Sequence, residues 1–288
     1  MSNNLWHSDD MNKRPFYKSE TPWYSPEAGF FGALYQMGDD SLEGYLSKTK
    51  QTQDERTKEE VEGVIQLLDL KQAAKICDCP CGIGRHSIEL AKMGHQVLAV
   101  DNNPSQLSEL HKRIIVERVA INWNIQPMIE DMRYLIHSPN HEPMDAVINM
   151  FFSFGFFNSY QENRLVARNF FDLLKPGGKF LMHTDVNMAH IRSGKYKSYE
   201  RRHLKNGLFL IITECYLSDT KRIEGCWTLV DKENELFGMK GYSVRVYEVE
   251  EFVALCKSVG FKEVKTYSDW QESPYSEEAE MIIFVAEK

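Results

Sequence analysis

The sequence predicts an α/β fold in which a parallel sheet carries helices on both faces and a separate antiparallel β insertion follows. Strand-like and helix-like segments alternate with short links between Lys75 and Asp185, as in βαβ units. Three β-branched and aromatic runs then follow one another without a helix, which favours an antiparallel sheet. A chain of 288 residues suits one core of about 200 residues with an addition.

In the first half, apolar residues from Val61 to Leu68 keep helical spacing, so a helix begins near Thr57 and leads into the first strand. That strand ends at Asp78, and a glycine-rich turn, a helix and a second strand ending at Asp101 follow. Pro176 and Gly177 end a later helix. The pattern beyond Asp101 predicts helices over residues 104–119 and 165–174, and strands over 125–129, 144–150 and 179–185.

In the second half, the insertion strands are expected over residues 208–217, 222–230 and 242–247, separated by SDTK and DKENELFG. A helix over 250–259 closes with Gly260, and strands over 262–267 and 281–286 complete the chain. A loop rather than a crossover helix leads to the last strand, which is therefore expected to be antiparallel to its neighbour.

The chain divides into a cap segment over residues 1–55, a core over 56–187 and 248–288, and the insertion over 188–247. The cap segment mixes aromatic residues with Gly, Pro, Ser and Asp, so it is expected to form short helices that cover a neighbouring surface. The aromatic strands of the insertion suit either a lid over a substrate site or the interface of a homodimer.

Composition narrows the function classes. The chain has 42 acidic and 34 basic residues and a formal charge of −8, which disfavours nucleic acid as a partner. It has no apolar run of about 18 residues and its N-terminus is polar, so we expect no membrane span, no signal peptide and a cytoplasmic protein. Cys77, Cys79 and Cys81 are too closely spaced for a zinc pair, and we expect no metal.

The glycine turn predicts a nucleoside-type cofactor. Gly82 and Gly84 allow the backbone to pass close to a ligand, and Asp101 follows at the distance of an acid that binds ribose hydroxyls. The third glycine of a dinucleotide site is replaced by Ser87, and Asp78 would repel a pyrophosphate but hold an amino group. S-adenosylmethionine has an ammonium, a sulfonium and no phosphate, so we expect it as the cofactor.

The stretch DCPCGIGRHSIELAKMGHQVLAVD resembles motif I of the class I S-adenosylmethionine-dependent methyltransferases, in the DxPCGxGRH form of a bacterial small-molecule-type group. The resemblance extends over ERT (55–57), EDMR (130–133), NMFFSFGFF (149–157), LKPGGKFLMHTDVN (174–187) and SDWQESPY (268–275). It implies a Rossmann-like seven-stranded sheet with a reversed last strand, but no particular substrate. Phe156 and Phe157 depart from the group's usual Gly-Tyr-Phe, and His183 stands where aliphatic residues are usual.

Candidate cofactor residues follow from these motifs. Asp78 and the turn are expected to hold the methionine end, Asp101 the ribose and Asp131 the adenine amino group. The fourth strand ends beside the expected position of the methyl group. The full set is Asp78, Cys79, Pro80, Cys81, Gly82, Gly84, Arg85, Asp101, Asn102, Asn103, Asp131, Met132, Asn149, Met150 and Phe151.

Alignment of the reactants and exclusion of water lower much of the barrier to methyl transfer, and a base is needed only for a protonated nucleophile. Candidates for catalysis are His183, Asp185, Tyr242, Arg245 and Tyr247. His86 is expected to bond to the turn backbone instead. Arg56, Arg133 and Arg245 are of the type that binds a substrate carboxylate.

The sequence thus predicts a methyltransferase that uses S-adenosylmethionine to methylate N or O of a small molecule, without excluding a protein acceptor. One alternative is an NAD(P)-dependent oxidoreductase, against which Ser87 and the last strand weigh. Another is a protein that binds S-adenosylmethionine without catalysis, which would use the same residues.

Overall fold

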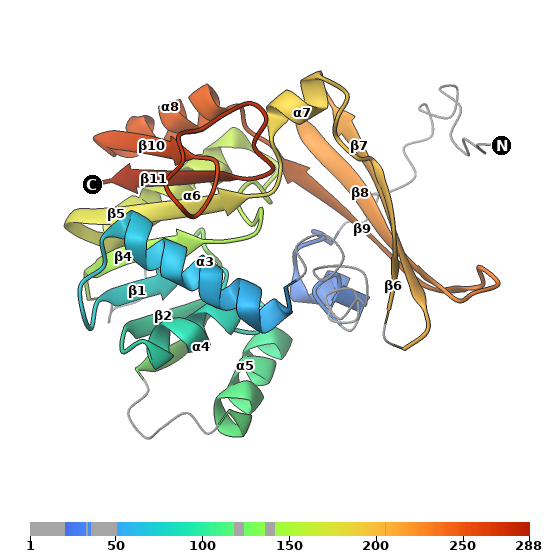
Figure 1. Cartoon of the computed structure of the whole chain (residues 1–288), viewed down its shortest axis with the longest axis horizontal. Coiled ribbons are helices and arrows are strands. Elements are labelled where there is room, and N and C mark those ends of the chain that lie inside the picture. Colours follow the sequence, from blue (N-terminus) through green and yellow to red (C-terminus); the bar gives the residue numbers. More distant parts are fainter. Residues whose placement is uncertain (1–20, 33, 36–50, 118–123, 136–141, 205) are drawn as a thin grey trace.

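A computed structural model describes residues 21–32, 34–35, 51–117, 124–135, 142–204 and 206–288. Its central sheet has seven strands in the order β10-β11-β5-β4-β1-β2-β3 (Figure 1). Only β11 runs antiparallel to its neighbours, β5 and β10, within this sheet. The strands are β1 (Lys75–Asp78), β2 (Gln96–Asp101), β3 (Ile125–Ile129), β4 (Met144–Asn149), β5 (Leu174–Thr184), β10 (Glu263–Tyr267) and β11 (Ile282–Glu287). The prediction of a parallel sheet with a reversed last strand is confirmed.

Helices cover both faces of this sheet. Buried residues of α3 (Gln53–Leu68), α4 (Arg85–Lys92) and α5 (Pro104–Val116) pack in one apolar cluster with the sheet. Buried residues of α6 (Tyr160–Leu173) and α8 (Val249–Val259) pack in another. Among the helices in the described ranges, none combines the length and apolar character needed to cross a bilayer.

A separate antiparallel sheet follows α7 (Met188–Arg192), as predicted, and stands beside the core in Figure 1. It has the order β6-β7-β8-β9, with β6 at Tyr199–His203, β7 at Phe209–Leu217, β8 at Arg222–Val230 and β9 at Leu236–Arg245. The described residues 21–32 and 34–35, which include the short helix η2 (Pro26–Ala28), lie between the two sheets in blue.

Several predicted boundaries were wrong. The strand expected over 242–247 begins at Leu236, because part of the charged stretch taken for a loop pairs with β8. Strand β6 was missed because its sequence, YERRH, is polar, as suits the edge of a sheet. Capping boxes at Thr52 and Ser159 start α3 and α6 several residues before their apolar patterns. Strand β5 likewise begins at Leu174 rather than residue 179.

Other expectations remain partly open. The helix expected over 104–119 ends at Val116, and its last predicted residues, 118–119, lie outside the described residues. The same holds for residues 1–20, 33 and 36–50 of the expected cap. Helix α3 crosses the boundary placed after residue 55, and the division into cap, core and insertion stays a prediction.

Candidate active site

The glycine turn between β1 and α4 crosses the carboxyl ends of three neighbouring strands. The Cys79 amide donates to the backbone of β4 (3.0 Å), and the Cys81 amide donates to the backbone of β2 (2.8 Å). Gly84 has a φ of +75°, and a Cβ there would lie 2.2 Å from a methyl carbon of Leu110 in α5. Glycine is therefore required for this turn, which lies at the sheet edge where open α/β sheets bind ligands.

A cavity of about 230 Å³ opens beside the turn. Most of the predicted cofactor residues line it, and they come from the end of β2, the start of α4 and the loops that follow β1, β2, β3 and β4. They are Cys79, Pro80, Cys81, Gly82, Arg85, Asp101, Asn102, Asp131, Met132, Met150 and Phe151. The lining does not include Asp78, Gly84, Asn103 or Asn149.

Two of those four residues place unpaired acceptors beneath the turn. Asp78 is buried and accepts a hydrogen bond from the Ser87 hydroxyl through Oδ2 (2.6 Å), while its Oδ1 has no partner among the described residues. Asn149 donates to the Cys79 carbonyl (2.9 Å), and its Oδ1 is likewise unpaired within the described chain. Burial raises the pKa of Asp78 to about 7, although the hydrogen bond from Ser87 acts to lower it. Such unpaired buried acceptors suit a ligand that brings hydrogen-bond donors and positive charge.

Asp101 lies at the end of β2 and holds the turn from the other side. Its Oδ2 accepts from the Gly82 amide (2.9 Å) and its Oδ1 from the Asn103 amide (2.8 Å). Burial raises the pKa of Asp101 to about 6, although these two hydrogen bonds act to lower it. Asn103 caps α5 through its side chain, which accepts from the Ser105 amide.

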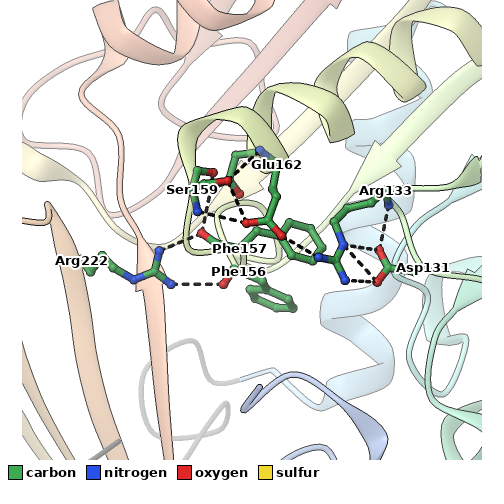
Figure 2. Close-up of polar contacts among 8 residues, drawn as sticks. Asp131, Arg133, Phe156, Phe157, Ser159, Glu162 and Arg222 are labelled. Carbon is green, nitrogen blue, oxygen red and sulfur yellow. Dashed lines mark hydrogen bonds and ion pairs between the residues drawn. The ribbon is translucent and has the colours of Figure 1, made fainter. Parts of the chain in front are cut away.

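Asp131 is tied to a neighbouring arginine. Arg133 donates from Nη2 to Asp131 (2.8 Å) and from Nη1 to Glu162 (2.6 Å), as Figure 2 shows. Glu162 also closes the capping box of α6 with Ser159, so the start of α6 is connected to the cavity wall. The Arg133 guanidinium lies 4.3 Å from the centre of the Phe157 ring.

A buried charge network supports the turn from α3. Glu60 accepts from Arg56 Nε (2.7 Å) and Arg85 Nη1 (2.5 Å), and lies 3.0 Å from His86 Nε2. Although burial opposes it, the His86 contact and the arginine charges hold the pKa of Glu60 well below its usual value. Burial and Arg85 lower the pKa of His86 to about 4. The expected bond from His86 to the turn backbone was therefore wrong, since its partner is a carboxylate.

Phe151 connects this network to the end of β5. The guanidinium carbons of Arg56 and Arg85 lie 4.8 and 4.2 Å from its ring centre. Phe151 and Phe152 both have positive φ values, 56° and 57°. Residues other than glycine rarely adopt this backbone conformation, and those that do cluster at functional sites. The Phe151 amide donates to Nδ1 of His183 (3.3 Å).

Of the predicted catalytic residues, His183 lies in β5 against the Phe151 ring and Asp185 follows directly after the strand, and neither lines the cavity. His183 is fully buried, and its Nε2 lies 3.3 Å from the Asp185 carboxylate. Asp185 keeps 52% of its side chain exposed. Desolvation raises the pKa of Asp185, but His183 and Arg56 outweigh it and the pKa is lowered. Asp185 is thus an accessible, ionised acceptor at the carboxyl end of the strand.

The candidates in the insertion lie away from the cavity lining. Arg245 pairs with Glu251 (3.3 Å) and donates to backbone carbonyls. Tyr247 is partly buried among Phe154 and Phe252. Tyr242 donates to Glu214, a residue that sequence reasoning missed.

The aromatic segment before α3 forms another wall of the cavity. Tyr24, Phe31 and Tyr35 line the cavity, as do Phe156 and Phe157 after β4. Behind them, Trp23 lies 4.7 Å from Phe156 and 6.0 Å from Tyr242, between ring centres. Tyr35 stacks on Trp227 of β8 at 5.3 Å.

Sequence reasoning also missed lining residues that come from several elements. Four of them stand inside the motifs quoted above without having been assigned to the cofactor site, and only Gln53 and Gln106 lie outside every quoted motif. They are Gln53, Ile83, His86, Gln106, Glu130 and Ser153.

The comparisons with known proteins agree with this geometry. Residues 76–178 match the family model described as a methyltransferase domain. The chain is 26% identical over 259 residues to a glycine/sarcosine/dimethylglycine N-methyltransferase of Actinopolyspora halophila, covering 85% of this chain but only 42% of that longer relative. It is 25% identical to a glycine/sarcosine N-methyltransferase of Aphanothece halophytica, covering 86% and 89% of the two chains.

A solved structure has the same fold. The CcbJ methyltransferase from Streptomyces caelestis superposes with a TM-score of 0.70 at 15% identity, over 87% of this chain and 97% of that one. The glycine turn, the carboxylate of Asp101 at the end of β2 and the unpaired acceptors of Asp78 and Asn149 fit S-adenosylmethionine. Together with the match to the methyltransferase domain, they identify the chain as an S-adenosylmethionine-dependent methyltransferase with a class I fold.

Proposed function

We propose that this enzyme methylates the nitrogen of a small amine, held between the carboxyl end of β5 and the insertion sheet. The observation that carries this proposal is a group of polar atoms that can only accept hydrogen bonds. It consists of Asp185 and of the triad Tyr196, Glu214 and Tyr242.

Within the triad, both tyrosine hydroxyls donate their protons to the Glu214 carboxyl group. Tyr196 donates to Glu214 Oε2 (2.5 Å), and Tyr242 donates to Glu214 Oε1. With their protons so placed, the two phenolic oxygens offer only lone pairs to a ligand. A nitrogen that carries hydrogens is the complementary group.

The strand register places Glu214 and Tyr242 on the face of the insertion that meets the aromatic segment. Glu214, Gly225 and Tyr242 lie opposite one another on β7, β8 and β9, so their side chains share a face. A Cβ at Gly225 would lie 2.3 Å from the Tyr242 ring, so glycine lets that ring lie across the sheet toward Glu214. On the same face, Tyr242 contacts Trp23 and Phe30, whose neighbours line the cavity.

Asp185, on the core, acts on Tyr196 of the triad through its charge. Burial and Glu214 raise the pKa of Tyr196, and the charge of Asp185 adds to them. Tyr196 therefore senses the ionised Asp185 of the core and bonds directly to Glu214 of the insertion, whose pKa is raised by burial. The negative charge of Asp185 favours the binding of a cationic amine over that of a neutral alcohol.

Around the cavity, Asp78 and the glycine turn hold the methionine end, as the sequence predicts, and the structure leads us to add Asn149 and Arg85 to them. Asp101 holds the ribose, and Asp131 with Met132 holds the adenine. Bound S-adenosylmethionine supplies an electrophilic methyl group on its sulfonium. Trp23 and Phe30, which pack on Tyr242, exclude water from the insertion side of the acceptor, and Asp185 with the two tyrosines aligns its nitrogen lone pair.

Proton removal fits the same arrangement. An amine arrives largely as its ammonium ion at neutral pH and must lose a proton before its lone pair can react. One N–H bond of the ammonium breaks and its proton goes to water at the exposed side of Asp185, while the carboxylate accepts a hydrogen bond from a remaining N–H. The two curated relatives named above, which are N-methyltransferases, also support nitrogen over oxygen as the acceptor atom.

The test is turnover of matched acceptors by the purified chain with S-adenosylmethionine carrying a trideuterated methyl group. Glycine, sarcosine and an amino sugar are compared with hydroxyl analogues such as glycolate, and products are identified by mass spectrometry. We expect label on nitrogen in at least one amine. Label on a hydroxyl analogue but on none of the amines would overturn the proposal.

A further inference from the structure

Arg222, at the start of β8, joins the insertion to the loop that follows β4. This arginine is buried, and its guanidinium donates from Nη1 to the Phe157 carbonyl (2.9 Å) and from Nη2 to the Phe156 carbonyl (3.1 Å). On its other side it donates to the Ser243 hydroxyl (2.7 Å) and the Ser243 carbonyl (2.6 Å). Figure 2 shows the two bonds that reach across to Phe156 and Phe157.

The loop approaches the insertion closely at a second point. The Arg245 amide of β9 donates to the Gly155 carbonyl (2.8 Å). Gly155 has a φ of +101°, and a Cβ there would lie 2.2 Å from the Arg245 carbonyl oxygen. The backbone of the loop is therefore held against the ends of β8 and β9 over residues 155–157.

The same loop supplies part of the cavity wall. Phe156 and Phe157 line the cavity, where Phe157 faces Arg133 and Phe156 packs on Trp23. Arg222 satisfies the carbonyls of both residues at once, because its guanidinium presents several donors in a planar fork. A lysine has the charge but not the fork, and a methionine has neither.

We propose that Arg222 is a positioning residue, which fixes the Phe156–Phe157 wall of the cavity relative to the insertion sheet. The position of the insertion sheet thus determines the position of this wall, and through it the affinity for the ligand, although Arg222 itself does not line the cavity. The inference rests on methyl transfer in this cavity and does not depend on a nitrogen acceptor.

The experiment compares Arg222→Met and Arg222→Lys with Arg201→Met. Arg201 is an exposed arginine of the same sheet, whose guanidinium lies over Phe209 (4.3 Å), so its replacement removes one charge without touching the loop. A milder variant, Ser243→Ala, keeps Arg222 but removes one of its acceptors. Amide hydrogen exchange over residues 154–159 and calorimetric affinity for S-adenosylhomocysteine are measured for each protein.

In Arg222→Met we expect exchange over 154–159 to rise and affinity to fall, each about tenfold, because two buried carbonyls lose their donor. Arg222→Lys should recover part of the exchange protection and part of the affinity. Ser243→Ala should change both quantities slightly, and Arg201→Met should match the parent protein in both. Unchanged exchange and affinity in Arg222→Met would overturn the inference. So would equal loss of protection throughout β7 to β9, since Arg222 would then only stabilise the insertion. Neither readout needs an acceptor, so failure here is distinct from failure of the amine proposal.

Discussion

Replacing Glu60 by Gln is the perturbation whose size follows most directly from the structure. The substitution keeps the shape of the side chain but removes the charge that faces two guanidinium groups and His86. Glu60 is 1% exposed, and the side chains of Arg56 and Arg85 are 17% and 13% exposed, so water compensates little. Removing one partner of such a buried pair costs about 3–5 kcal/mol.

Urea denaturation followed by circular dichroism gives the free energy of unfolding of Glu60→Gln. The control is Glu62→Gln, an exposed position on the same helix. We expect a loss of about 3 kcal/mol or more for Glu60→Gln and less than about 0.5 kcal/mol for the control. Because Arg85 lines the cavity, affinity for S-adenosylhomocysteine should also fall in the first variant. Equal unfolding midpoints for the two variants would refute the assigned role of this network.

Three further predictions concern the ligands. Asp101→Ala should weaken S-adenosylhomocysteine binding by about 2 kcal/mol, roughly thirtyfold, because the ribose hydroxyls lose a charged acceptor; unchanged affinity would remove Asp101 from the site. Burial raises the pKa of Asp78 to about 7, from an ordinary value of about 3.9. Between these two values the folded protein without ligand holds a proton that the unfolded chain releases. The contribution of Asp78 to the free energy of unfolding therefore falls as pH rises from about 4 to 7. An ammonium bound beside Asp78 keeps it ionised, so at pH 7 the calorimetric binding heat should depend on the ionisation enthalpy of the buffer, and Asp78→Asn should remove most of that dependence. Glu214→Gln should raise the KM of an amine acceptor about tenfold and leave S-adenosylhomocysteine affinity unchanged. Glu224→Gln, on the opposite face of the same sheet, is its control, and equal KM values would count against the triad.

The turn and its acids could be predicted because they depend on local spacing. Gly82, Gly84 and Asp101 lie within one strand-turn-helix-strand unit, and the short links of that unit leave little freedom in how they meet. The parallel sheet and its reversed last strand could be predicted from the alternating patterns and the final loop, whereas the number of seven strands came from the family resemblance.

The supporting contacts could not be predicted, because they join residues far apart in the chain. Glu60 precedes Arg85 by 25 residues, and Arg222 follows Phe156 by 66, so only the folded chain brings them together. The sequence indicated that the first aromatic segment covers a surface, but not that Trp23 lies between Phe156 and Tyr242. Arg245 resembled a substrate ligand by residue type alone, and the structure pairs it with Glu251.

A crystal structure of the chain with S-adenosylhomocysteine and an accepted amine tests the central claim most directly. We predict the nucleoside at Asp101, the sulfur beside Phe151, and the amine nitrogen within hydrogen-bonding distance of Asp185, Tyr196 or Tyr242. An amine bound elsewhere, or a nucleoside outside the cavity beside the glycine turn, would contradict the account.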